Sequence, residues 1–201
     1  MNRSRSIVLS IVLFTITAAN ASAQSIHYGL EAGTNIFKMG GMSFDNKSKF
    51  GYSAGVYSDI QIHGRWGLQP ALLFNEYSAK TADQFNNLYH GASFQNVNLS
   101  YVSLPILVTF KTSDLFTILA GPQYGYLVYQ TQDLIRDPAE PRNVFAKNDL
   151  SIVFGGQLNL GRIRFGGRYV IGVTELNNLP DKQVDSWKTQ GFQFYLTFRV
   201  K

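Results

Sequence analysis

The most regular stretch of the sequence is GFQFYLTFRV (residues 191–200), in which the side chains alternate in character with a period of two. One set of alternate residues is entirely apolar and comprises Phe192, Phe194, Leu196, Phe198 and Val200. The other set is mostly polar and comprises Gln193, Tyr195, Thr197 and Arg199. Successive side chains of a β-strand point to opposite faces of its sheet, so this pattern predicts a strand with one apolar and one polar face.

The same alternation recurs in the chain before this stretch. Residues 163–173 show it again, with Phe165 and Ile171 in the apolar set and Arg164 and Arg168 in the polar set. We predict eight strands in all, at 26–37, 50–62, 66–78, 97–110, 115–130, 149–160, 163–173 and 191–200.

The connections between these strands alternate in length along the chain. The long connections are 38–49, 79–96, 131–148 and 174–190, and the short ones are 63–65, 111–114 and 161–162. Bacterial outer-membrane barrels have this order, with short periplasmic turns and long outer loops. The strand lengths also suit a tilted membrane strand of about 9–11 residues. The sequence therefore predicts an all-β fold, an eight-stranded antiparallel up-and-down transmembrane β-barrel.

The direction in which each face points follows from the narrow interior of such a barrel, which its own side chains fill. We expect the polar, glycine-rich face to line the lumen, with Gln157 on it, and the apolar face, with Phe154 and Ile171, to contact lipid. Aromatic residues near the strand ends are typical of girdles at the two membrane interfaces. They are Tyr28, Trp66, Phe74, Phe110, Phe116, Tyr129 and Phe198.

Three prolines lie inside predicted strands, at Pro70, Pro105 and Pro122. Proline cannot donate a hydrogen bond to the ladder, and a closed barrel has no edge strand that could accommodate it. We therefore expect local bulges or strand ends at these three positions.

The first 23 residues are predicted to be a secretory signal peptide. Arg3 and Arg5 form a basic head, residues 7–19 are mostly apolar, and residues 21–23 (ASA) supply a small-x-small cleavage site. A transmembrane anchor needs about 20 apolar residues, more than this run contains. We therefore expect a cleaved signal peptide at 1–23, an outer-membrane β-barrel domain at 24–201, and a location in the cell outer membrane.

The composition argues against several classes of function. Cysteine is absent, and the three histidines, His27, His63 and His90, are far apart in the sequence, which disfavours thiol chemistry and metal clusters. Phosphate-binding glycine motifs are absent too. The net charge is +5, but the basic residues are scattered, which disfavours nucleic-acid binding. We therefore expect no cofactor, no metal and no catalytic residues.

Five motifs share a loose pattern of aromatic, glycine and aliphatic residues. They are YGLEAGTNIF (28–37), GYSAGVYSDIQI (51–62), YVSLPILVTF (101–110), LAGPQYGYLV (119–128) and GRYVIGVTEL (167–176). In order and spacing they resemble the PorT-like outer-membrane β-barrel family of Bacteroidetes, over essentially the whole of 24–201. The resemblance implies an eight-stranded outer-membrane barrel, and the family's namesake is linked to protein secretion. The family commonly has an acidic residue two positions before the proline of its fourth strand, where this chain has Ser103.

Five charged residues fall on the predicted lumen face, the acids Glu31 and Asp59 and the bases Arg164, Arg168 and Arg199. A charge buried without a partner is strongly destabilising, so at least one of these carboxylates should bond one of these guanidinium groups. Glu31 and Arg199 lie on the first and last strands, which are neighbours in a closed barrel. This lumen charge network would be either a polar plug that fixes the strand register or a gate in a narrow pore.

Together these features predict a small outer-membrane barrel with a structural, anchoring or interaction role, and the resemblance adds an accessory role in protein secretion. Two alternatives stay open, a narrow passive pore and an outer-membrane lipid-modifying enzyme. The expected partners are outer-membrane lipid, lipopolysaccharide, the barrel-assembly machinery and an envelope protein, and not nucleic acid. The connection 131–148 carries charges of both signs and two prolines, so it is either a solvated loop or a surface for such a partner.

Overall fold

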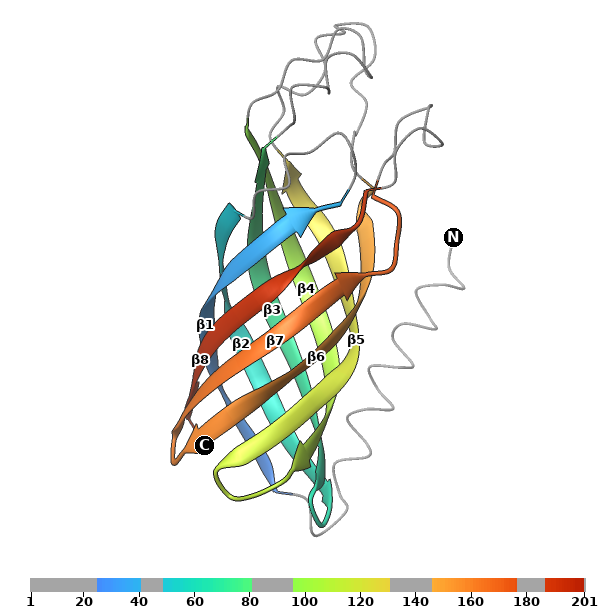
Figure 1. Cartoon of the computed structure of the whole chain (residues 1–201). Coiled ribbons are helices and arrows are strands. Elements are labelled where there is room, and N and C mark those ends of the chain that lie inside the picture. The colour runs from blue at the N-terminus through green and yellow to red at the C-terminus, as the bar shows by residue number, and fades with distance from the viewer. Residues whose placement is uncertain (1–24, 41–48, 81–95, 131–145, 177–186, 201) are drawn as a thin grey trace, which may run out of the picture.

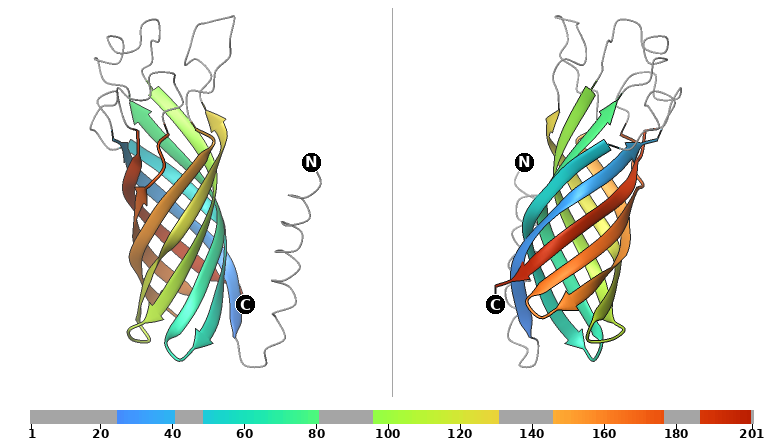
Figure 2. Two further views of the ribbon diagram at one scale, coloured as in Figure 1. Left: turned by 90° about the vertical axis from the view of Figure 1, so that its right-hand side faces the viewer. Right: turned by 60° about the vertical axis from the view of Figure 1, so that its left-hand side comes forward.

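The chain forms a closed barrel of eight antiparallel strands that follow one another in sequence order. The computed structural model describes residues 25–40, 49–80, 96–130, 146–176 and 187–200. Closure occurs where the first strand pairs with the last, with Glu31 opposite Thr197. Figures 1 and 2 show the strands tilted around a common axis, and every strand is paired on both sides.

The strands begin and end within two residues of their predicted bounds. They are β1 (Ile26–Met39), β2 (Lys49–His63), β3 (Trp66–Lys80), β4 (Asn96–Lys111), β5 (Phe116–Gln130), β6 (Asn148–Leu160), β7 (Ile163–Gly172) and β8 (Thr189–Arg199). The predicted fold class, an eight-stranded antiparallel barrel, is thus confirmed. In the described ranges, no helix is long and apolar enough to cross a membrane.

The three short connections lie together at one end of the barrel, at the bottom of Figure 1, and we refer to this as the short-turn end. They are residues 64–65, 112–115 and 161–162. Gly64 and Gly161 have φ angles of 55° and 68°, a conformation that glycine adopts without the strain a side chain would introduce. Outer-membrane barrels keep short turns on the periplasmic side, so we expect this end to face the periplasm.

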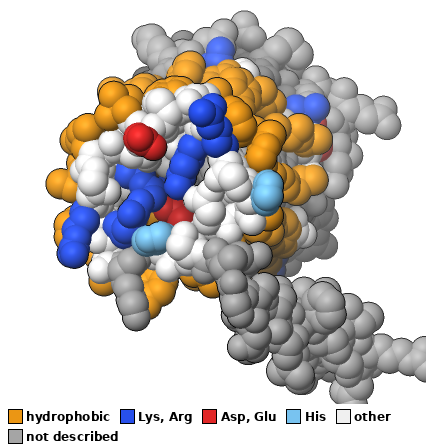
Figure 3. Space-filling view, turned by 90° about the horizontal axis from the view of Figure 1, so that it is seen from below, with side chains coloured by type: hydrophobic (Ala, Val, Ile, Leu, Met, Phe, Trp, Pro, Cys, Tyr) orange, Lys and Arg blue, Asp and Glu red, His pale blue; other side chains and the backbone are white. Residues whose placement is uncertain are grey.

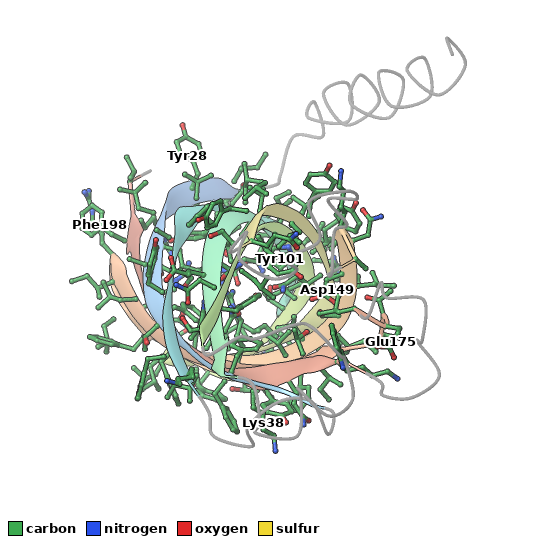
Figure 4. The ribbon with its side chains drawn as sticks, turned by 90° about the horizontal axis from the view of Figure 1, so that it is seen from above. Tyr28, Lys38, Tyr101, Asp149, Glu175 and Phe198 are labelled. Carbon is green, nitrogen blue, oxygen red and sulfur yellow. The ribbon has the colours of Figure 1, made fainter. Side chains whose placement is uncertain are left out.

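The two faces of the strands point as the alternation predicts. Phe154 and Ile171 are on the outer surface and are 49% and 40% exposed, whereas Gln157 points into the barrel and is 3% exposed. Viewed along the axis in Figure 4, Tyr28 and Phe198 project outwards from the wall. The outer surface is therefore the apolar one, as contact with lipid requires.

The expectation that the prolines lie at bulges or strand ends is wrong. Pro70, Pro105 and Pro122 lie inside β3, β4 and β5. Each proline lies at a gap in one ladder: residues 69–70 of β3 are unpaired towards β2, residues 104–105 of β4 towards β3, and residues 121–122 of β5 towards β4. The register is the same on both sides of each gap. The barrel thus accommodates the missing donors by interrupting the pairing locally, without shifting one strand against the next.

Candidate functional site in the barrel lumen

Side chains fill the barrel lumen, as the view along its axis shows (Figure 4). Leu73, Asn75, Val153 and Gln193, which come from three different strands, are all 0% exposed. The filling consists of successive layers between the centre of the barrel and its two ends.

The central layer contains an ion pair between Glu31 on β1 and Arg168 on β7. Nη2 of Arg168 lies 2.6 Å from Oε1 of Glu31, and both side chains are 2% exposed. Nε of Arg168 donates to Oε1 of Gln193 at 2.7 Å, and the Tyr195 ring centroid lies 4.7 Å from the guanidinium carbon. A carboxylate, an amide and an aromatic face therefore compensate for the water that this arginine loses on burial.

A second ion pair lies closer to the short-turn end, between Arg164 on β7 and Asp59 on β2. Nη2 of Arg164 is 2.5 Å from Oδ2 of Asp59, and the side chains are 6% and 19% exposed. Nε2 of Gln69 donates to the other carboxylate oxygen at 2.9 Å, and the Tyr57 ring lies 5.6 Å from the guanidinium carbon. Each pair thus links β7 to a strand on the other side of the closing seam.

Three side-chain amides cross the lumen next to the central ion pair. Nε2 of Gln193 donates to Oδ1 of Asn35 at 2.9 Å and to Oδ1 of Asn75 at 3.1 Å. Nδ2 of Asn35 in turn donates to the backbone carbonyl of Tyr52 at 3.0 Å. These bonds connect β8, β1, β3 and β2, so the amides hold the walls of the barrel together across its interior.

The end of the lumen opposite the short turns is filled by apolar and aromatic side chains. The main members of this outer layer are Phe37, Tyr77, Leu99, Tyr101, Leu127, Leu176 and Trp187. Leu176 and Trp187 are both 0% exposed, and the backbone N–H of Leu176 donates to the carbonyl of Trp187 at 2.9 Å. Leu176, which follows β7, and Trp187, which precedes β8, are therefore packed into this end of the lumen.

Asp149 is a buried acid of the lumen that the predicted charge network did not include. It is 4% exposed, and its carboxylate accepts hydrogen bonds from Thr174 at 3.1 Å, Thr189 at 3.2 Å and Ser151 at 3.3 Å. Its place could have been found from the sequence, because it precedes Ser151 by two residues and so shares the polar face of that strand. Among the residues that the structure describes, these three hydroxyl groups are the side-chain partners of the carboxylate, and no basic side chain pairs with it.

The structure brings four of the five predicted charged residues together as two ion pairs, Glu31 with Arg168 and Asp59 with Arg164. Arg199 lies opposite Gly29 across the closing seam, closer to the short-turn end than Glu31. The neighbouring strands β1 and β8 therefore do not bring Glu31 and Arg199 to the same height.

The described histidines lie at the short-turn end, where His27 is the second residue of β1 and His63 is the last residue of β2. His90, the predicted signal peptide at 1–23 and residues 131–145 of the third long connection lie outside the described residues. Within the described part of the chain, no three His, Asp or Glu residues are placed to hold a metal ion.

A closed eight-stranded barrel with an apolar outer surface and a polar lumen defines a small outer-membrane β-barrel protein. The chain belongs to the family described as outer membrane protein beta-barrel domain, which matches residues 21–200. No curated protein matches the chain.

Two solved structures share this fold at low sequence identity. Neisserial surface protein A has a TM-score of 0.52 and 12% identity, covering 88% of this chain and 99% of that one. The attachment invasion locus protein Ail of Yersinia pestis, solved with the heparin analogue sucrose octasulfate, has a TM-score of 0.51 and 12% identity, with the same two coverages. At this identity the likeness establishes the fold and nothing beyond it.

The filled lumen leads to a prediction at Gly166, a lumen-facing residue of β7. A Cβ added there would lie 2.0 Å from Cζ of Tyr195, the ring that packs against Arg168. We expect Gly166→Ala to lower the free energy of unfolding by about 1–3 kcal/mol, the usual effect of overpacking. Equilibrium unfolding in urea, with the protein refolded into lipid vesicles, measures this loss.

The neighbouring Gly167 provides a matched control for this substitution. It faces lipid, and a Cβ added there would meet the Phe194 ring at 3.5 Å, an ordinary van der Waals contact. Gly167→Ala should therefore leave the stability close to that of the original protein. Equal stability of the two variants would show that Tyr195 does not occupy the lumen beside Gly166.

Proposed function

We propose that this outer-membrane barrel is closed to solutes and acts as an anchored structural or interaction protein, not as a pore. The observation that carries the proposal is the complete burial of side chains across the lumen at several heights. Tyr101 in the outer layer, Gln193 in the amide layer and Val153 on β6 are each 0% exposed. An eight-stranded barrel is narrow enough for its own side chains to fill it, and here they do.

The two ion pairs favour a plug over a gate. Opening a path past the central layer would separate Glu31 from Arg168, whose side chains are both 2% exposed. Breaking such a buried pair costs about 3–5 kcal/mol, and the amides and the apolar outer layer would also have to move. The lumen therefore fixes the register of the barrel, which leaves the surfaces outside the lumen to contact partners such as lipopolysaccharide or an envelope protein.

We further infer that the chain belongs to the PorT-like part of its family, with an accessory role in protein secretion. The support is the order and spacing of the five motifs, which span β1, β2, β4, β5 and β7. Ser103, at the position where that family commonly has an acid, points into the lumen and is 1% exposed. Any function that depends on that acid would be absent from this chain.

Recording single-channel currents in planar bilayers tests the closed barrel. We expect the purified full-length barrel, reconstituted at a density where a porin shows regular current steps, to show none. The result follows from the burial of the central layer, because ions need a continuous water path. Reproducible unitary currents that change in size in an Arg168→Met variant would contradict the proposal and establish a narrow pore.

A further inference from the structure

A cavity opens at the short-turn end of the lumen, beyond the ion pair between Asp59 and Arg164. Its volume is about 240 Å³, and Figure 3 shows it as a hollow with basic side chains around it. The charged residues that line it are the bases Arg65, Lys111, Arg164 and Arg199 and the acids Asp59 and Asp114. We refer to this cavity as the basic cup. With His27 neutral, its lining has an excess of two positive charges.

Two guanidinium groups of the basic cup have donors without acceptors. The Nε atoms of Arg164 and Arg199 are buried and have no hydrogen-bond partner in the part of the chain that the structure describes. Oδ2 of Asp59 lies 2.5 Å from Nη2 of Arg164 and Oδ1 accepts from Gln69, but neither oxygen accepts a hydrogen bond from the two Nε atoms. A buried donor without an acceptor is destabilising, and an anion entering from solvent would relieve this penalty.

Lys111 adds a positioned cation at the rim of the basic cup. It is the last residue of β4, and its ammonium donates to Oε1 of Gln61 at 2.8 Å. A neutral amide fixes the direction of the ammonium without cancelling its charge. The cup therefore combines a buried arginine, Arg164, and a half-buried arginine, Arg199, with a lysine that is already oriented.

The geometry points to the basic cup as a binding site for a small phosphate monoester. Guanidinium groups bind phosphate oxygens through parallel charge-assisted hydrogen bonds. A phosphate monoester carries a charge of about −1.5 to −2 at pH 7, which matches the excess of two positive charges better than a single carboxylate does. The cavity is smaller than the roughly 300–1,000 Å³ of pockets for drug-sized ligands, so it suits a small molecule.

The position of the basic cup indicates that the phosphate group belongs to a soluble molecule and not to a phospholipid. The cup lies inside the ring of strands and opens along the barrel axis (Figure 3), whereas phospholipid headgroups surround the barrel from outside. This site is independent of the proposed function, because a cup below a filled lumen binds a ligand without conducting it.

Titration calorimetry of the full-length barrel in an uncharged detergent, with glycerol 3-phosphate as the probe, tests the site. We expect saturable binding that weakens as salt is added, because the attraction is electrostatic. Arg199→Gln and Lys111→Gln should each weaken it about tenfold, the effect of losing one charged hydrogen bond. Asp114→Asn, which removes an opposing negative charge, should tighten it. Acetate, with one charge, should bind at least about tenfold more weakly than glycerol 3-phosphate.

Arg162→Gln is the matched control, because Arg162 is exposed at the same end of the barrel but does not line the cup. It should bind glycerol 3-phosphate as the original protein does. Absence of saturable binding in the millimolar range, or equal losses in Arg162→Gln and Arg199→Gln, would overturn the site.

A second arm of the experiment distinguishes a soluble phosphate monoester from a phospholipid headgroup as the ligand. The barrel is reconstituted into bilayers of phosphatidylcholine alone or with phosphatidylglycerol, and the titration with glycerol 3-phosphate is repeated. We expect the same affinity in both, since lipid headgroups do not reach the cup. Loss of binding in the bilayers with phosphatidylglycerol would overturn the soluble ligand and assign the cup to a lipid headgroup.

Discussion

Replacing Arg168 with methionine is expected to lower the free energy of unfolding by about 3–5 kcal/mol, because the Glu31 carboxylate then stays buried without its cation. The Glu31 side chain is 2% exposed, so water cannot replace the lost partner. Urea titration of protein refolded into lipid vesicles, followed by tryptophan fluorescence, measures the change. Arg162→Met, at an exposed position of a short connection, should change the stability by no more than about 0.5 kcal/mol.

The double variant Glu31→Leu with Arg168→Met distinguishes a lost ion pair from a lost packing contact. Removing both charges together should be less destabilising than Arg168→Met alone, since no uncompensated charge is left in the lumen. The single variant Glu31→Leu should have a smaller effect than Arg168→Met, because Arg168 would keep Gln193 and the Tyr195 ring. Additive effects, with no coupling in the double-mutant cycle, would contradict the pairing.

An arginine on the lipid face should also be strongly destabilising. Phe154 and Ile171 project from the outer surface of β6 and β7, on two neighbouring strands. Phe154→Arg and Ile171→Arg should each lower the free energy of unfolding in lipid by about 2–4 kcal/mol if the residues lie near the bilayer midplane. The measurement is again a urea titration in lipid vesicles.

The control for the lipid-face variants must face the lumen and also reach water. Gln157 faces the lumen but is 3% exposed and accepts a hydrogen bond from the Tyr195 hydroxyl, so arginine would not fit there. Asn159, on the same strand as Phe154, lines the basic cup. Asn159→Arg should have a smaller effect than Phe154→Arg. If all three variants are equally stable, the assignment of the faces is wrong.

The fold could be predicted from the sequence because its determinants are local. A strand with one face in lipid and one in the lumen must alternate at every residue, as in the stretch that contains Phe192 and Gln193. The order of long and short connections then gives the up-and-down topology. The barrel closes between β1 and β8, because each of these strands has only one neighbour in the sequence. The prolines do not require bulges or strand ends, because a missing donor can also be accommodated by a gap in the ladder.

The pairing inside the lumen could not be predicted, because it depends on the heights of residues on different strands. The alternation places Glu31, Arg168 and Arg199 on the lumen face but does not relate their positions along the barrel axis. Those positions follow from the register, in which Glu31 lies opposite Thr197, and Arg168 lies opposite Gln193. Glu31 therefore reaches past β8 to Arg168 on β7. The basic cup could not be predicted either, because Lys111 and Asp114 lie at the turns, where alternation does not assign side chains to a face.

The closed lumen is tested most directly by the reactivity of a thiol placed inside it. Ser53 points into the lumen from β2, is 2% exposed, and its hydroxyl has no hydrogen-bond partner among the described residues, so Ser53→Cys is nearly isosteric and breaks no described bond. The chain has no cysteine of its own, and Ser113→Cys in an exposed short connection provides the control.

Both variants are treated, while folded, with a small water-soluble thiol reagent, and the labelled fraction is followed by mass spectrometry. We predict rapid labelling of the Ser113→Cys variant and none of the Ser53→Cys variant until urea unfolds the barrel. Labelling of the folded Ser53→Cys variant at the rate of the control would show that water fills the lumen, and would contradict the closed barrel.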